Sequence, residues 1–344
     1  MKQKRIRDFG IEIGHFPCGA HNKITDVPGV TVGQVTLRKG EIQTGVTVVM
    51  PAQDNLFTCK MTAACHVLNG FGKTTGLLQI QELGCLETPI ALTNTLNVGL
   101  VSDGLIQYTL TRCRAEGIEV TSINPIVAEC NDSRINAIAL RAVTQQHVWQ
   151  AIAQAGEEFD EGAVGGGTGM VCFGLKGGIG SASRRLRIGE KEYTLGILVQ
   201  SNFGSLEELR IEGKQLGLEI KEKLAQHSEP EKGSIIAVVA TDVPLSDRQL
   251  TRLLRRVPIG LGRLGSYTGH GSGEVFIGFS TAQRWMEEEK SDVLTVDVLR
   301  EEKLDQLFLA VADATEEAVL NSMVTAEATE GRKGETFHSL KEFL

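Results

Sequence analysis

Three stretches of the sequence are continuously apolar over the length of a strand, and they restrict the possible folds more than any other feature. They are Met170–Gly174, Leu195–Gln200 and Ile235–Ala240. A strand with one solvated face alternates apolar and polar side chains, whereas a strand covered on both faces is apolar throughout. We therefore expect a central sheet that is buried on both sides.

Further strands are predicted near the N-terminus and late in the chain. Residues 24–50 contain short apolar runs separated by turn residues, and residues 274–281 form another apolar run, both of which are typical of strands. Residues 205–232 are rich in Glu and Lys, so we expect a surface excursion with some helix there.

Helical patterns occur in several blocks between these strands. Three of them end before a glycine that can adopt a left-handed cap, and a fourth begins after Ser246, which can cap its first turn. The predicted helices are 74–83 before Gly84, 98–116 before Gly117, 135–155 before Gly156, the segment from Ser246 to Gly260 and Gly262, and the amphipathic segment 301–326. Runs of strands and runs of helices predict an α+β protein built of packed layers rather than strict βαβ alternation.

Charge and composition exclude several classes of partner. The net charge is −8, and acidic and basic residues are mixed along the chain without a basic stripe, so no nucleic-acid partner is expected. No run of about 18 apolar residues is present to span a membrane.

The seven cysteines and the N-terminal segment bear on location and metal content. The cysteines are scattered through apolar stretches without paired spacing, which indicates reduced thiols. The N-terminal segment is too short and polar for a signal peptide, so we expect a cytoplasmic protein. The histidines show no metal-binding pattern, and we expect no metal and no cofactor.

The pair Gly265-Ser266 lies between a predicted helix and a predicted strand. Because glycine adopts dihedral angles closed to other residues, Gly265 can present its carbonyl to the Ser266 hydroxyl for an N-to-O acyl shift. Hydrolysis of that ester would free the α-amine of Ser266. An α-amine has a reference pKa of about 7.7 to 8.0, so it can accept the hydroxyl proton near neutral pH. Taken alone, such a pair is usually an ordinary loop.

The pair Gly265-Ser266 is interpreted through ordered sequence blocks along nearly the whole chain. The blocks are Arg7–Gly14, Asn22–Gly33, Glu87–Gly99, Gly165–Ser183, Val199–Gly204, Ala240–Leu245, Arg256–Ser266 and Ala314–Met323. Together they resemble the L-aminopeptidase/D-amidase-esterase family of self-processing aminopeptidases, which includes the β-aminopeptidases.

The resemblance implies a fold and a maturation step. The implied fold is a four-layer αββα sandwich, similar to N-terminal-nucleophile hydrolases but with different strand connectivity. Residues 1–344 would form a single domain, cut by the chain itself into residues 1–265 and 266–344. The resemblance also implies a homo-oligomer of cleaved protomers.

Three catalytic positions follow from the resemblance. Ser266 corresponds to the family nucleophile, and Asn202 to the side-chain amide that helps hold the oxyanion. Glu316 lies in the segment expected to orient or charge the new amine, although Ala314 stands where a serine is expected. Without the resemblance, Asn202 could be a turn-forming residue at a strand end and Glu316 a solvated helix residue.

The block from Glu129 to Arg134 corresponds to the wall of the substrate pocket. A carboxylate of Glu129 or Asp132 could bind a substrate ammonium, or either could cap the helix that follows. Relatives commonly have an aromatic residue near the position of Arg134, so substrate preference is expected to differ.

The expected function is that of an autoprocessed serine aminopeptidase or amidase-esterase. It would hydrolyse N-terminal residues from short peptides, amides or esters, with Ser266 as nucleophile and its own α-amine as base. One alternative is an acyltransferase similar to ornithine acetyltransferase, whose nucleophile is a threonine. Another is a binding protein of the same fold that is never processed.

Overall fold

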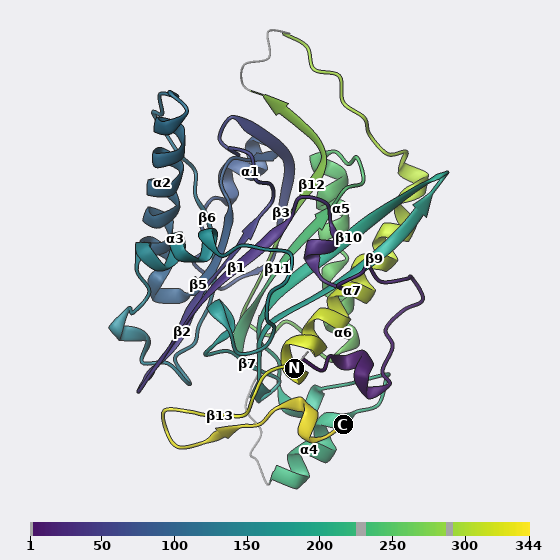
Figure 1. The fold of residues 1–344 in the computed structure, drawn as a ribbon. Coiled ribbons are helices and arrows are strands. Elements are labelled where there is room, and N and C mark those ends of the chain that lie inside the picture. The colour runs from purple at the N-terminus through teal and green to yellow at the C-terminus, as the bar shows by residue number, and fades with distance from the viewer. Residues whose placement is uncertain (1–2, 225–231, 287–291) are drawn as a thin grey trace.

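The computed structural model describes residues 3–224, 232–286 and 292–344. Two stacked sheets form its centre, and helices cover the outer face of each (Figure 1). The smaller sheet has the order β1-β2-β5-β6 and the larger the order β4-β3-β12-β11-β10-β9. Neighbouring strands are antiparallel except for β5 with β6 and β11 with β12, which are parallel. This arrangement is the expected α+β sandwich.

The strands of the smaller sheet are β1 (Thr31–Lys39), β2 (Ile42–Met50), β5 (Ile90–Asn94) and β6 (Ile126–Cys130). Those of the larger sheet are β3 (Cys59–Gly70), β4 (Cys85–Leu86), β9 (Gly178–Ile188), β10 (Lys191–Asn202), β11 (Lys232–Thr241) and β12 (Gly271–Met286). Two short hairpins, β7–β8 (Val171–Cys172, Leu175–Lys176) and β13–β14 (Thr329–Glu330, Thr336–Phe337), lie outside them.

The helices form the two outer layers. Helices α2 (Val98–Ala115) and α3 (Gln145–Ala153) pack on the smaller sheet, and α5 (Asp247–Leu254), α6 (Val257–Arg263) and α7 (Leu304–Val324) lie on the side of the larger sheet. Two further helices are α1 (Leu77–Leu83) and α4 (Leu216–Leu224).

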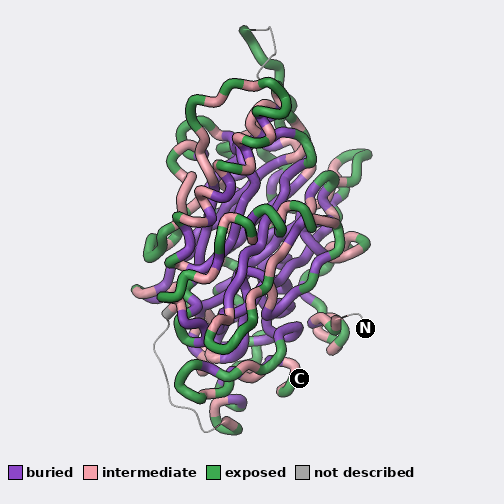
Figure 2. Tube along the Cα trace, turned by 60° about the vertical axis from the view of Figure 1, so that its left-hand side comes forward, coloured by how far each residue is buried: buried purple, intermediate pink, exposed green. Residues whose placement is uncertain are grey.

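Successive side chains of a strand point to opposite faces of the sheet, and both faces of these strands are apolar, which explains why the layers stack. In β2, Val48 faces the core beneath α2 and α3, while its neighbour Val49 faces the core between the sheets. In β10, Leu198 faces the core between the sheets, while Ile197 faces the core beneath the other helical layer. Figure 2 shows the resulting block of buried strands at the centre. These strands are apolar on both faces, as their sequences predict.

The third predicted helix is shorter than expected. Helix α3 begins at Gln145, whereas residues 135–144 are held against the turn between β1 and β2. There Asn136 accepts a hydrogen bond from the backbone N–H of Gln43 at 3.0 Å. Gly156 does not form a left-handed cap but exchanges backbone hydrogen bonds with Val32. Tertiary hydrogen bonds therefore override the helical pattern on both flanks.

Three other segments also differ from the prediction. The helix after Ser246 is broken into α5 and α6, because Pro258 begins a new helix, and Gly260 and Gly262 lie inside α6. Residues 170–174 do not form a central strand but contain β7 and the turn of the β7–β8 hairpin, where Phe173 and Gly174 have positive φ. Helix α7 is buried all round from Ala310 onward and is not amphipathic there, because the larger sheet, α6 and the N-terminal segment surround it.

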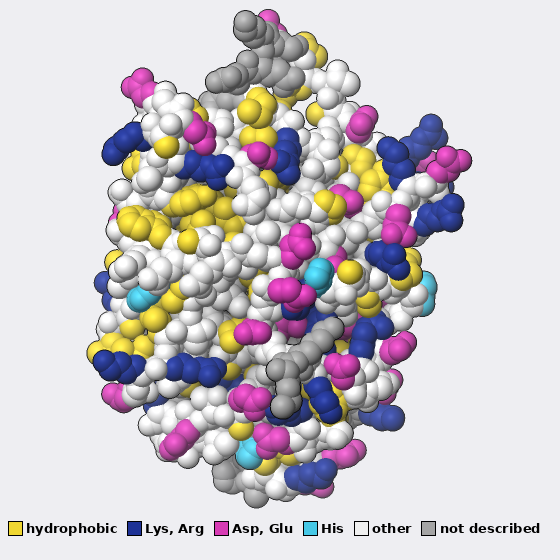
Figure 3. All heavy atoms as spheres, viewed as in Figure 1, with side chains coloured by type: hydrophobic (Ala, Val, Ile, Leu, Met, Phe, Trp, Pro, Cys, Tyr) yellow, Lys and Arg dark blue, Asp and Glu magenta, His cyan; other side chains and the backbone are white. Residues whose placement is uncertain are grey.

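The remaining predicted elements are confirmed. The acidic and basic stretch 205–232 contains α4, and its residues 225–231 lie outside the described part of the chain. The seven cysteines are free thiols and six are buried. No described helix is long and apolar enough to span a membrane. On the face shown in Figure 3, acidic and basic side chains are interspersed.

Candidate active site

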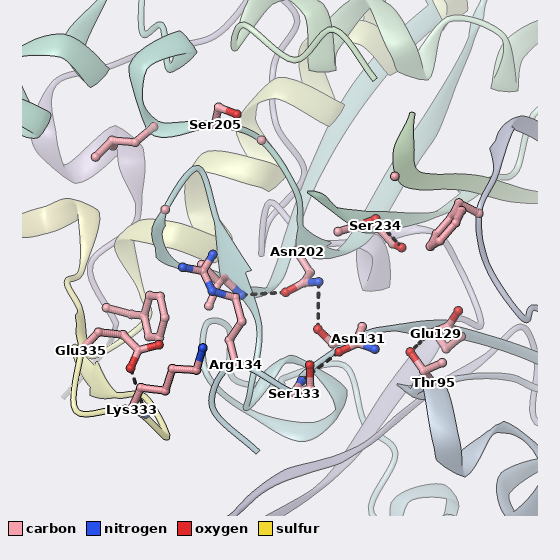
Figure 4. Close-up of a pocket in the computed structure, with 18 of the residues that line it drawn as sticks. Thr95, Glu129, Asn131, Ser133, Arg134, Asn202, Ser205, Ser234, Lys333 and Glu335 are labelled. Atoms are coloured by element: carbon pink, nitrogen blue, oxygen red, sulfur yellow. Dashed lines mark hydrogen bonds between the residues drawn. The ribbon is translucent and has the colours of Figure 1, made fainter. Parts of the chain in front are cut away.

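A cavity of about 880 Å³ opens at the end of the larger sheet where β10 ends and β11 and β12 begin. In the sheet register Asn202 pairs with Ser234, and Ser234 pairs with Gly273. The volume of the cavity lies within the range usual for sites that bind small molecules. Figure 4 shows the side chains that converge on it, among them Asn202, Glu129 and Arg134.

Asn202 is the last residue of β10, and its amide is held at both ends. Its Oδ1 accepts a hydrogen bond from the backbone N–H of Val171 at 2.9 Å, and its Nδ2 donates to the carbonyl of Asn131 at 3.1 Å. A primary amide nitrogen carries two hydrogens. With one hydrogen bound to Asn131, the second is available to an oxygen in the cavity. The amide is thus a fixed donor.

Glu129 lies in β6, and only 3% of the residue is exposed. Its carboxylate accepts a hydrogen bond from the backbone N–H of Lys73 at 2.9 Å and another from the hydroxyl of Thr95. These donors hold the charged carboxylate at the cavity wall, where it can receive a cationic group.

Asp132 is placed differently from Glu129. It is fully buried and accepts hydrogen bonds from Thr44, Asn94 and Asn136, at 2.6, 3.0 and 3.0 Å. Burial raises the pKa of this carboxyl, while those three hydrogen bonds act in the opposite direction. Asp132 does not line the cavity. Its hydrogen bonds instead fix the segment after β6 in the interior.

Arg134 lies at the opposite end of the cavity from Glu129 (Figure 4). Its guanidinium carbon is 4.7 Å from the centre of the Phe337 ring, a cation–π contact. Its carbonyl accepts a hydrogen bond from the backbone N–H of Arg332 at 3.0 Å. The β13–β14 hairpin thereby positions this arginine.

Ser266 lies in the segment that joins α6 to β12. Gly265 packs against Glu208, next to the lining residue Glu207, and Gly271 itself lines the cavity. Ser266 is half-buried and is not among the lining residues. Its backbone N–H donates to the carbonyl of Leu261 at 3.1 Å. In this uncut chain the serine is tied to the end of α6.

The backbone has positive φ on both sides of Ser266. Gly265 has φ +98°, and a Cβ there would lie 1.8 Å from the carbonyl oxygen of Glu208. Thr268 also has a positive φ, +52°, which is unusual for a β-branched residue. Its N–H donates to the Ser266 hydroxyl oxygen at 3.2 Å. Such geometry is found at functional sites.

Glu316 is buried on α7 and reaches Ser266 only indirectly. Its carboxylate lies 3.3 Å from the guanidinium of Arg263, which also pairs with Asp313 at 2.6 Å. Burial raises the pKa of Glu316, and the hydrogen bond from Arg263 acts against this shift. Ala314 points into the apolar core. The helix therefore presents Glu316 to α6.

Several cavity residues carry no sequence signal for this role. Lys333 and Phe337 belong to a hairpin far along the chain from β6, and Lys73 lies in the loop before α1. Only the three-dimensional contacts bring them together. Among the described residues, no group of three or more histidine, cysteine or acidic side chains is arranged to hold a metal ion.

Comparison with known proteins identifies the family. Residues 22–337 match the family model of Peptidase family S58. The chain belongs to this family. The beta-peptidyl aminopeptidase BapA of Sphingosinicella microcystinivorans is 38% identical over 98% of this chain and 89% of its own length. This S58 peptidase is therefore an aminopeptidase.

Solved structures agree with this assignment. A beta-aminopeptidase from Burkholderia sp. has a TM-score of 0.88 and 39% identity, and the match covers 98% of this peptidase and 96% of that chain. The L-aminopeptidase D-Ala-esterase/amidase of Ochrobactrum anthropi has a TM-score of 0.91 and 35% identity over 98% and 95% of the two chains. The latter is described as a prototype for the serine aminopeptidases and a new variant of the Ntn hydrolase fold. The peptidase shares that fold.

Proposed function

We propose that this aminopeptidase cuts its own chain between Gly265 and Ser266 and uses the freed Ser266 as its nucleophile. The observation that carries the proposal is the backbone at Gly265, where φ is +98° and a Cβ would meet the carbonyl of Glu208. Only glycine fits there without strain. This glycine directly precedes a serine in the segment that joins α6 to β12, and Gly271 at the far end of that segment lines a cavity that contains a fixed amide donor.

Self-cleavage would proceed through an ester. The Ser266 hydroxyl oxygen attacks the carbonyl carbon of Gly265, the carbon–nitrogen bond breaks, and the nitrogen of Ser266 takes the proton. Water then hydrolyses the ester, leaving a carboxylate on Gly265 and a free amine on Ser266. Cutting also frees Ser266 from the chain that ties it to α6, so it can approach the cavity.

Catalysis would use the same hydroxyl. The α-amine of Ser266 accepts the hydroxyl proton as the oxygen attacks the substrate carbonyl, and then passes it to the leaving amine. The second Nδ2 hydrogen of Asn202 stabilises the oxyanion. Glu129 binds the ammonium of the substrate, since an aminopeptidase must recognise a free amine. Water completes the cycle by hydrolysing the acyl-enzyme.

Glu316 acts as a positioning residue in this scheme. Through Arg263 it holds the last turn of α6, from which the Ser266 segment emerges. The homo-oligomer of cleaved protomers and the cytoplasmic location remain predictions, as does the preference among short peptides, amides and esters.

The test of self-cleavage is a comparison of intact masses. Purified wild-type protein should give two fragments, residues 1–265 and 266–344, whereas Ser266→Ala should stay intact and inactive because one hydroxyl performs both reactions. Ser133→Ala, which removes an exposed serine from the cavity wall, serves as the control and should be cut normally. Peptide hydrolysis by Ser266→Ala, or a wild-type chain that stays uncut and active, would contradict the proposal.

A further inference from the structure

A buried lysine is linked to Asn202 through a single peptide group. Lys176, in β8, is fully buried and is not among the residues that line the cavity. Its Nζ donates to the carbonyls of Met170 at 2.7 Å, Gly177 at 2.8 Å and Gly167 at 3.3 Å. Burying such a group is costly unless its hydrogen bonds are made. The proposed function gives this lysine no role.

The surroundings of Lys176 suit an ammonium group. An ammonium carries three hydrogens and accepts none, and three carbonyl oxygens surround it. Burial lowers the pKa of Lys176 to about 7, whereas the charge of Asp132 acts against this shift. A neutral amine would still have two hydrogens for the two nearer carbonyls, those of Met170 and Gly177. The contact with Met170 is therefore made in both protonation states.

The carbonyl of Met170 and the N–H of Val171 belong to the same peptide group. On one side this group accepts from Lys176 at 2.7 Å, and on the other it donates to Oδ1 of Asn202 at 2.9 Å. A peptide group is planar, so fixing its carbonyl also fixes the direction of its N–H. Figure 4 shows the Asn202 amide held by two hydrogen bonds, one of them to the carbonyl of Asn131.

A charge at one end of this chain of hydrogen bonds also acts on the other end. The chain runs from the ammonium through the peptide group to the side-chain amide of Asn202. Hydrogen bonds in series polarise one another, and they do so more strongly in a buried region. A positive charge beside the first carbonyl draws electron density toward it and makes each following N–H a stronger donor. The last donor is the second Nδ2 hydrogen of Asn202.

We propose that Lys176 is a positioning residue that acts through the peptide group of Met170 and Val171 to orient and polarise the Asn202 amide toward the substrate oxyanion. This inference rests on the proposed function and deepens it, because it concerns the same donor. Lys176 does not touch the substrate. Its effect therefore belongs to the transition state, in which the oxyanion forms, and not to substrate binding.

The experiment compares two substitutions in the same buried loop. Lys176→Met keeps an unbranched stem and removes the donor to Met170. Thr168→Val is the control, because it removes the hydroxyl that donates to the carbonyl of Gly165 at 2.6 Å, a bond outside the chain that leads to Asn202. Steady-state kinetics are measured on the best substrate of a panel of L-, D- and β-aminoacyl p-nitroanilides, and kcat is counted per cleaved chain from the intact mass.

The two variants should differ in kcat and not in KM. Lys176→Met should lower kcat by roughly 10- to 100-fold, because complete removal of an oxyanion donor costs about 100- to 1,000-fold and a misoriented donor costs less. Its KM should stay within about 3-fold of wild type. Thr168→Val should leave kcat within about 2-fold, since a surrounding loop that loses one hydrogen bond still holds the amide.

A double-mutant cycle separates an effect through Asn202 from a general disturbance of the loop. In an Asn202→Ala background no amide remains to be oriented, so adding Lys176→Met should lower kcat by less than about 2-fold. If Lys176→Met does not fold or cleave itself, Lys176→Gln takes its place. Glutamine is one bond shorter and uncharged, so a smaller fall in kcat is expected, again absent beside Asn202→Ala. If Asn202→Ala stays uncut, the comparison with Thr168→Val decides.

The outcomes distinguish this inference from the proposed function. Unchanged kcat in the Lys176 variants, a loss confined to KM, an equal loss in Thr168→Val, or a full further loss beside Asn202→Ala overturns the role of Lys176 while leaving the Ser266 mechanism intact. Wild-type kcat in Asn202→Ala alone, or hydrolysis by Ser266→Ala, would instead overturn the proposed function.

Discussion

At the scale of single residues, Asn202 is the donor that the proposed mechanism assigns to the oxyanion. Two backbone groups, the N–H of Val171 and the carbonyl of Asn131, fix the amide in one orientation. A donor that is fixed before the reaction needs no reorganisation when charge develops, and this is why such groups stabilise oxyanions strongly. The turn-forming role that is common for asparagine at strand ends does not account for this arrangement.

Substitution of Asn202 by aspartate tests that role with little change of shape. Asn202→Asp keeps the oxygen that accepts from Val171 but removes the donor, so kcat should fall by about 100-fold or more while KM changes little. Steady-state kinetics on a dipeptide provides the measurement. Asn131→Ala is the control, because Asn131 lines the same cavity and contacts Asn202 only through its backbone. An effect confined to KM would assign Asn202 to substrate binding.

Some site residues could be predicted from the sequence and others could not. Asn202, Glu129 and Arg134 lie in ordered blocks that resemble a known family, and the structure brings all three to one cavity. Asp132 belongs to the same block as Glu129, but it is buried and accepts hydrogen bonds from the side chains of Thr44 and Asn94. Lys333 lies in a distant hairpin. Such placements depend on tertiary contacts that no local pattern encodes.

At the scale of elements, the crossing of α6 and α7 positions the Ser266 segment. The helices approach so closely at Gly260 that a Cβ there would lie 2.5 Å from the carbonyl oxygen of Ala312 and 2.7 Å from the Cβ of Thr315. The sequence suggests that Gly260 ends a helix, because glycine usually does so. It lies within one instead, since the close approach to α7 requires the absence of a side chain.

The neighbouring glycine in α6 provides a matched pair of substitutions. Gly260→Ala should lower the free energy of unfolding by about 1 to 3 kcal/mol, because overpacking forces the helices apart. Gly262 has no atom within 4 Å of the Cβ position, so Gly262→Ala should be neutral or stabilising by up to about 1 kcal/mol. Urea denaturation of both variants in a Ser266→Ala background measures the difference on uncut chains. Equal effects of the two substitutions would show that the crossing is not tightly packed.

At the scale of the whole molecule, the proposed cut falls between parts that share the same cores. The segment after Ser266 supplies β12, which lies between β3 and β11 in the larger sheet, and α7, which packs on β9 and β10. Phe276 of β12 and Val311 of α7 belong to the core beneath the helices, and Ile277 belongs to the core between the sheets. The layered fold could be predicted because strands buried on both faces require two covering layers. The central place of β12 could not, because strand order depends on contacts far apart in sequence.

This interleaving predicts that the cut protein stays together. Removing β12 and α7 would expose two apolar cores and break hydrogen bonds along both edges of β12. Cutting one peptide bond does not offset this cost. On native size exclusion, residues 1–265 and 266–344 should therefore elute together in equal amounts and at the volume of uncut Ser266→Ala. They should separate only at denaturant concentrations that unfold the protein. Fragments that part in native buffer would mean that β12 and α7 contribute far less to stability than their burial indicates.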